Sequence, residues 1–136
     1  MQIEGVDYDE TFVLVAKLAF LCMILALAAE RNLELQQMDV KSTYLNEDLC
    51  EEIFMEAPPG FDIPGSMVLC LIKVVYGTKQ GGRVWYEKIS EKLGTMGYQH
   101  TEPDYAVFTS ARGDASIIAL YVDDITMAGA NLKAIN

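Results

Sequence analysis

The stretch IIALYVDDITMAGA, residues 117–130, places two aspartates side by side within an apolar run that is typical of a β-strand. Two carboxylates about 4 Å apart repel each other by roughly 4 kcal/mol at an effective dielectric constant of ~20. Asp123 and Asp124 therefore need a compensating positive charge. The apolar residues on either side predict one strand that ends at the aspartates and a second strand, within 123–129, that turns back from them.

The rest of the chain predicts two helices and several further strands. Residues 12–29 are apolar nearly throughout, and residues 84–96 carry apolar side chains at helical spacing. The proline-rich and glycine-rich stretch 58–66 predicts a loop. Strand-like patterns occur at 33–40, 51–57, 67–76, 105–110 and 115–122. This order favours an α+β fold in which an antiparallel sheet carries helices packed on one face.

Length and composition indicate a single globular domain that spans residues 1–136, with 51% hydrophobic and 22% charged residues. Lys17 interrupts the first apolar segment, and only 12 uncharged residues follow it before Glu30. Because a membrane-spanning helix needs about 20 apolar residues, we expect a buried helix and no membrane segment. The three cysteines lie far apart without a CxxC pair, which disfavours disulfides and structural zinc and favours a reducing, intracellular environment.

The formal net charge of −10 has the wrong sign for a protein that holds nucleic acid unaided. Any nucleic-acid role must therefore be local, aided by metal, or supplied by segments outside this chain. Asp39 ends the strand predicted at 33–40, and three carboxylates converge if that strand lies beside the one that ends at Asp123. Clustered carboxylate oxygens suit two Mg²⁺ or Mn²⁺ ions, which can assist a phosphoryl transfer. The alternative is an exposed hairpin tip, because Asp-Asp pairs are common in turns, and the spacing alone leaves both open.

A wider resemblance favours the metal site. YVDD between apolar strands resembles the active-site hairpin of reverse transcriptases, and most of the chain is similar to the Ty1/copia class of retrotransposon polymerases. Five blocks carry this similarity in the order of the family: GVDYDETF (5–12), LALAAERNLELQQMDVKSTYLNEDL (25–49), EEIFMEAPPGF (51–61), VYGTKQGGRVWYEK (75–88) and LYVDDITMAG (120–129).

The resemblance implies an RNA-directed DNA polymerase that transfers nucleotides to a primer 3′-hydroxyl with two Mg²⁺ or Mn²⁺ ions. Asp39, Asp123 and Asp124 would be the catalytic residues, and the same three residues together with the Val40 backbone carbonyl would bind metal. The implied partners are an RNA or DNA template with its primer and a deoxynucleoside triphosphate. The implied location is intracellular, either in a cytoplasmic virus-like particle or in the nucleus.

The resemblance also implies four nucleotide-binding residues, Tyr44, Lys79, Gln80 and Arg83. Taken alone, Tyr44 would be an ordinary half-buried tyrosine and the other three the solvated start of a helix. Trp85 and Tyr86 are expected in the core rather than in a base-stacking platform.

The chain departs from the family pattern at several places, two of which bear on the turns and loops near the site. A glycine is usual at Glu47, and an Ala-Pro pair is usual where Gly81 and Gly82 stand, so the loop that positions the nucleotide is expected to be loosened.

The implied fold is a palm-like sheet with partial fingers and no thumb, so residues 1–136 would form a single partial reverse transcriptase domain. Segments that belong to the fingers, the thumb and the RNase H domain are expected to be missing, which predicts little activity for the chain alone. The alternative is a non-catalytic retroelement relic or interaction module that retains the palm fold.

Overall fold

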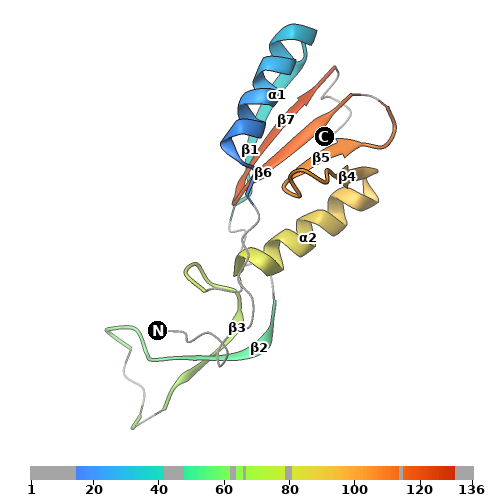
Figure 1. The fold of residues 1–136 in the computed structure, drawn as a ribbon. Coiled ribbons are helices and arrows are strands. Elements are labelled where there is room, and N and C mark those ends of the chain that lie inside the picture. The colour runs from blue at the N-terminus through green and yellow to red at the C-terminus, as the bar shows by residue number, and fades with distance from the viewer. Residues whose placement is uncertain are drawn as a thin grey trace.

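The computed structural model describes residues 15–41, 48–61, 64–65, 67–78, 81–113 and 115–130, and it confirms the predicted α+β class. Two helices and two antiparallel sheets form the described part of the chain (Figure 1). The helices are α1 (Leu18–Arg31) and α2 (Gly81–Thr95). The strands are β1 (Glu34–Asp39), β2 (Asp48–Met55), β3 (Leu69–Lys73), β4 (Tyr98–His100), β5 (Val107–Ser110), β6 (Ile117–Tyr121) and β7 (Asp124–Gly129).

The main sheet has five strands in the order β1-β7-β6-β5-β4, and each neighbouring pair is antiparallel. The predicted hairpin of 117–130 therefore forms the two strands β6 and β7, and β1 pairs with the outer side of β7. A separate two-stranded ribbon of β2 and β3 extends away from the main sheet on the side of α2 (Figure 1).

Both faces of the main sheet are covered. Ile118, Ala119 and Leu120 follow one another along β6, and each is at most 2% exposed. Because successive side chains of a strand point to opposite faces, three buried neighbours require cover on both sides. These three residues belong to a core that also includes Ile24 and Ala28 of α1.

The two helices supply this cover from opposite sides, which corrects the expectation that they pack on one face. Thr109 and Ile117 are register partners, so they share a face, and they line a hollow together with Leu27 of α1. Phe108 is one residue away from Thr109 and therefore points to the other face, where its ring lies 6.4 Å from that of Tyr86 of α2. A strand pattern shows which side chains are buried but not which helix covers them.

The first helix begins later than its sequence predicted. Residues 15–17 are not helical, and residues 12–14 lie outside the described part of the chain. The backbone N–H of Ala16 donates to the carbonyl of Leu120 at 2.8 Å, so this segment is tied to β6 before the helix starts at Leu18. The helix ends at Arg31, and Asn32 caps it in a left-handed conformation with φ of 51° that asparagine tolerates well.

The second helix begins earlier than predicted. Gly81 and Gly82 are helical and buried, so the expected loosening of a loop at these two positions is wrong. Strand β4 was not predicted, because three residues are too few to establish an alternating pattern. Among the described residues, neither helix combines the length and the apolar composition needed to cross a bilayer.

Asp104 connects the residue before α1 to the segment before β5 by hydrogen bonds, and it is only 5% exposed. Its Oδ2 accepts the backbone N–H of Lys17 at 2.9 Å, and its Oδ1 accepts that of Ala106 at 3.0 Å. We predict that Asp104→Ala lowers the free energy of unfolding by about 2–4 kcal/mol, because it leaves two N–H groups without their charged acceptor. Urea denaturation measures the change.

The free energy of unfolding of Asp104→Asn should lie between those of the native chain and of Asp104→Ala, since one of the two acceptor oxygens remains. Glu102→Ala is the matched control, because Glu102 is exposed and lies two residues away. Its effect should stay within about 0.5 kcal/mol. Equal losses for Asp104→Ala and Glu102→Ala would contradict the assignment.

Candidate active site

The register between β1 and β7 sets Asp39 directly opposite Asp124. In a directly opposed antiparallel pair the two Cα atoms lie about 4.5–5.5 Å apart, and both side chains point to the same face. The sequence left open whether the strand of Asp39 lies beside the strand that ends at the aspartates. In the structure β1 lies beside the returning strand β7, and β6 is one strand further away. Asp124 also pairs with Tyr121 across the β6–β7 hairpin, so Asp39 and Asp124 lie at the hairpin end of the sheet.

A loop of two residues, Val122 and Asp123, joins β6 to β7. Val122 has φ of 54°, a left-handed conformation that a β-branched residue rarely adopts. Such a conformation costs about 1–3 kcal/mol and persists only where surrounding contacts stabilise it. The hairpin that carries the acidic pair is therefore strained and must be held from outside.

Two hydrogen bonds to backbone carbonyls hold this loop. The indole Nε1–H of Trp85 in α2 donates to the carbonyl oxygen of Val122 at 2.9 Å. The backbone N–H of Val40, immediately after β1, donates to the carbonyl oxygen of Asp123 at 3.0 Å. Val40 thus contacts the hairpin through its N–H, and the role of its carbonyl as a metal ligand stays a prediction.

The Asp123 carboxylate has one held oxygen and one unpartnered oxygen. Its Oδ2 accepts the hydroxyl of Tyr76 at 3.1 Å. Its Oδ1 is buried, and no described residue supplies a hydrogen bond to it. A buried acceptor without a partner costs about 1–3 kcal/mol, and more when it is charged. A cation would relieve this penalty, so the site fits a divalent ion by the chemistry of its donors.

Asp39 and Asp124 are exposed, and Asp124 Oδ1 accepts the side-chain amide of Gln37 at 3.4 Å. Among the described residues, however, no three acidic, histidine or cysteine side chains are grouped closely enough to hold a metal ion. Asp39 and Asp124 share one face of the sheet, whereas Asp123 lies in the loop with its carboxylate held by Tyr76. The backbone therefore brings the three acidic residues to one end of the sheet without closing their side chains into a metal cage.

The predicted nucleotide-binding residues fall mostly outside the described part of the chain. Tyr44, Lys79 and Gln80 are among the residues that the structure does not describe. Arg83 is exposed in the first turn of α2, where its Nε lies 2.8 Å from Oε1 of Glu87. The role of all four in binding a nucleotide stays a prediction.

Sequence reasoning missed two aromatic residues that contact the hairpin. Trp85 was expected in the core, and Tyr76 was assigned no role, yet their polar groups bond to Val122 and Asp123. Tyr86 does pack against the core, and its hydroxyl donates to the carbonyl of Tyr105 at 2.9 Å. The available signal was chemical, because tyrosine and tryptophan usually give their polar atom a partner when they are partly buried.

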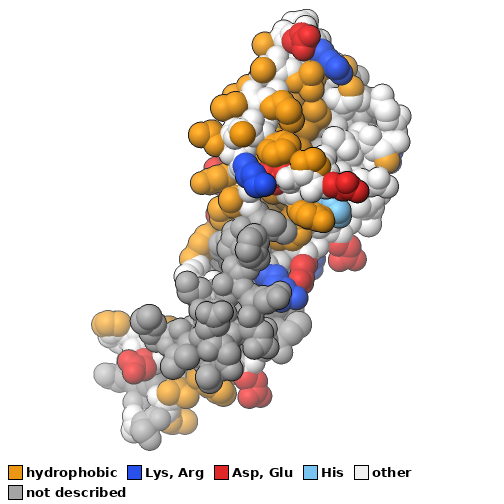
Figure 2. Space-filling view, in the orientation of Figure 1, with side chains coloured by type: hydrophobic (Ala, Val, Ile, Leu, Met, Phe, Trp, Pro, Cys, Tyr) orange, Lys and Arg blue, Asp and Glu red, His pale blue; other side chains and the backbone are white. Residues whose placement is uncertain are grey.

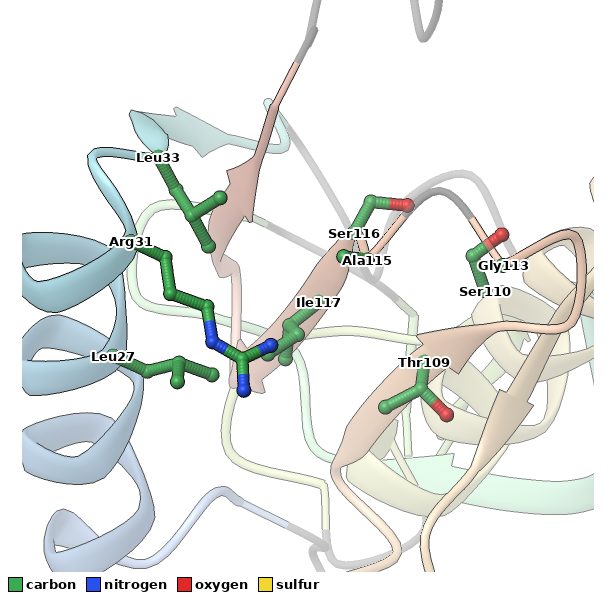
Figure 3. Close-up of a pocket in the computed structure, with 9 residues that line it drawn as sticks. All are labelled: Leu27, Arg31, Leu33, Thr109, Ser110, Gly113, Ala115, Ser116 and Ile117. Carbon is green, nitrogen blue, oxygen red and sulfur yellow. The ribbon is translucent and has the colours of Figure 1, made fainter.

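A hollow of about 260 Å³ lies near the opposite end of the sheet (Figure 3). The register pairs its residue Ile117 with Ala128, which is four residues, or about 13 Å, along β7 from Asp124. Figure 3 shows Arg31 of α1 pointing into this hollow. None of its described lining residues is acidic: Leu27, Arg31, Leu33, Thr109, Ser110, Gly113, Ala115, Ser116 and Ile117. The acidic hairpin is therefore the better candidate for metal-dependent chemistry.

Comparison with known proteins assigns the chain to a family. The profile of the family described as "Reverse transcriptase (RNA-dependent DNA polymerase)" matches residues 1–136. No solved structure gives a significant match.

Three relatives illustrate the similarity. The chain is 41% identical over 132 residues to the Retrovirus-related Pol polyprotein from transposon TNT 1-94 of Nicotiana tabacum. This alignment covers 94% of the chain and 10% of that polyprotein. The polyprotein from transposon RE2 of Arabidopsis thaliana is 38% identical over 129 residues, covering 92% of this chain and 9% of that polyprotein. The Transposon Ty1-BL Gag-Pol polyprotein of Saccharomyces cerevisiae is 32% identical over 111 residues, covering 81% of this chain and 6% of that polyprotein.

The chain thus spans at most a tenth of the length of these relatives. The match nevertheless includes the acidic hairpin and the strand that pairs with it. The chain belongs to the reverse transcriptase family, as the corresponding domain of Ty1/copia-type retrotransposon Pol polyproteins.

Proposed function

We propose that this chain supplies the metal-binding acids of an RNA-directed DNA polymerase, which adds nucleotides to a primer 3′-hydroxyl on an RNA or DNA template. The observation that carries the proposal is the pairing of Asp39 with Asp124 beside Asp123, whose Oδ1 is buried without a described partner. Family membership supports the polymerase class. Metal binding, catalysis and the individual residue roles are the proposed part.

Asp39, Asp123, Asp124 and the backbone carbonyl of Val40 would hold two Mg²⁺ or Mn²⁺ ions. Bound divalent ions would activate the primer hydroxyl and stabilise the charge that develops on the phosphate oxygens. The chain's own contribution is to keep these oxygen ligands in place. Tyr76 orients the Asp123 carboxylate, and Gln37 contacts that of Asp124.

The nucleotide and the template need further contacts. Tyr44 would lie against the sugar of the incoming nucleotide, and Lys79, Gln80 and Arg83 would position the nucleotide and the template. With a net charge of −10, the chain gains little from the counterion release that drives most nucleic-acid binding. We therefore assign the grip on the primer and template to other parts of a longer polyprotein.

Metal binding tests the acidic hairpin without requiring turnover. We predict that Asp123→Asn weakens Mn²⁺ binding by about tenfold or more, since even residues that only orient metal ligands contribute 10–100-fold to affinity. Electron paramagnetic resonance of free Mn²⁺ measures the affinity. Glu91→Gln, on the exposed face of α2, makes the same charge change away from the hairpin and should leave Mn²⁺ affinity unaltered.

The contradicting result is equally weak or equally strong Mn²⁺ binding by the Asp123→Asn and Glu91→Gln variants. It would mean that the ions respond to overall charge and not to the hairpin.

Primer extension tests the activity itself. This chain should replace the matching segment of the tobacco TNT 1-94 polyprotein, which shares 41% of its residues over 132 positions and supplies the remaining parts. We expect the chimera to extend a primer with Mg²⁺, and Asp123→Asn in the chimera to reduce extension to background. The parent polyprotein with and without its own segment sets the range of the assay. Equal extension by the chimera and its Asp123→Asn variant would end the proposal.

A second candidate function, a non-catalytic interaction module, is favoured by exposed apolar side chains. Leu18, Met23 and Leu25 of α1 are 74%, 55% and 50% exposed, although the sequence predicted a buried helix, packed on several sides or against a partner. Figure 2 shows hydrophobic side chains gathered over the region that α1 occupies in Figure 1. Such a patch often marks a protein–protein contact. The module predicts concentration-dependent association in light scattering together with intact metal-free folding.

Association that disappears in Met23→Lys would support this second function. A compact monomer at all concentrations would contradict it.

A further inference from the structure

Asp123 lies between two peptide units that are each anchored from outside the hairpin. The carbonyl oxygen of Val122 belongs to the peptide unit before Asp123, and it accepts the Trp85 indole N–H at 2.9 Å. The carbonyl oxygen of Asp123 belongs to the peptide unit after it, and it accepts the Val40 N–H at 3.0 Å. Since a peptide unit is planar, anchoring its oxygen also restricts the direction of the adjoining Cα. The two bonds together therefore restrict the backbone of Asp123.

The two anchors come from different parts of the fold. The Val40 bond comes from the residue directly after β1, one position beyond the last register pair Asp39–Asp124. The Trp85 bond comes from α2, which packs on the opposite face from α1 and is 37 residues away from Val122 in the sequence. It acts on Val122, the residue with the strained φ of 54°. Without the indole, the backbone of the loop would be held by the Val40 bond alone, and Tyr76 would contact only the Asp123 carboxylate.

We propose that Trp85 is a positioning residue for the metal-binding hairpin. Its indole N–H keeps the strained Val122 peptide in the orientation that places Asp123 beside the Asp39–Asp124 pair. The inference rests on the proposed function, because it assigns Trp85 a role toward the same acids. It goes further in tying the geometry of the site to α2, an element that carries none of the three acids.

The neighbouring residue provides a matched comparison. Tyr86 follows Trp85 on α2 and also gives a hydrogen bond of 2.9 Å to a backbone carbonyl, but its acceptor is Tyr105, outside the hairpin. Trp85→Phe and Tyr86→Phe each keep an aromatic ring and remove one such bond. If Trp85 only stabilised the fold, the two variants would behave alike. A role toward the hairpin requires them to differ.

Hydrogen exchange of the Val40 amide measures the hairpin without metal. That amide bonds to Asp123, so its protection reports how well the loop is held. We expect Trp85→Phe to accelerate its exchange roughly 5-fold, a loss equivalent to one ordinary hydrogen bond. Tyr86→Phe should leave this amide unchanged, although both variants shift the urea midpoint by a similar amount. Equal Val40 exchange in the two variants would overturn the proposal.

Mn²⁺ binding provides the second measurement. We expect Trp85→Phe to weaken Mn²⁺ binding about tenfold, in the range found when a residue that orients metal ligands is removed. Tyr86→Phe should bind as the native chain does. In the native chain, the single tryptophan gives one indole N–H resonance, and Mn²⁺ bound at the acids should broaden it.

The outcomes separate the two proposals. Mn²⁺ binding that is insensitive to Asp123→Asn removes the proposed function, and the role of Trp85 toward metal with it. Binding that depends on Asp123 but is equal in Trp85→Phe and Tyr86→Phe overturns the positioning role alone. If bound Mn²⁺ does not broaden the indole resonance, the positioning role is also overturned. Trp85 would then lie too far from the ions to orient their ligands.

Discussion

The antiparallel register between β1 and β7 is the constraint on which the candidate site depends. A shift of one residue in this pairing would move every side chain of β1 to the other face and would separate Asp39 from Asp124. Burial favours this register, because Met38 of β1 packs against the core opposite Ile125 of β7, which is 6% exposed. The hydrophobic core therefore determines where the acids meet, although it contains none of them.

The β6–β7 hairpin is held by contacts with residues distant in the sequence, and these contacts stabilise a backbone conformation that the loop residues disfavour. Val122 occupies a backbone conformation that valine avoids, and an isolated hairpin with this loop would relax out of it. Trp85 from α2 and Tyr76 from the segment after β3 reach the loop across 37 and 47 positions of sequence. Strain that persists at a loop because distant elements hold it is common at functional sites. The fold stabilises a geometry here that the local sequence disfavours.

The strands and helices that could be predicted from the sequence are those whose apolar residues form a local pattern along the chain. The alternation in 33–40 and the apolar run in 117–122 identified two strands, and the family resemblance identified Asp39, Asp123 and Asp124 as the catalytic acids. The positions of the helices over the sheet could not be predicted. Ile118 and Ala119 point to opposite faces of β6, but the sequence does not say which helix packs on each face. The partners of Trp85 and Tyr76 were equally hidden, since a contact across 37 residues leaves no local pattern. The late start of α1 left no local signal either, because the backbone before the helix bonds to Leu120 and, through Lys17, to Asp104, 87 positions away.

The charge of the chain and the state of Asp123 support the same role for metal. A chain with a net charge of −10 repels phosphate, and its acidic hairpin repels it most strongly at close range. Divalent ions at this point would reverse the local sign and would also supply the missing partner of the buried Asp123 Oδ1. Because the metal-free arrangement leaves that oxygen unsatisfied, an ion that reached it would stabilise the fold and prepare the hairpin to receive a phosphate group in the same event. Trp85 and Val40 would hold the backbone of Asp123 before such an ion bound, so that little of the binding free energy would be lost in ordering the loop.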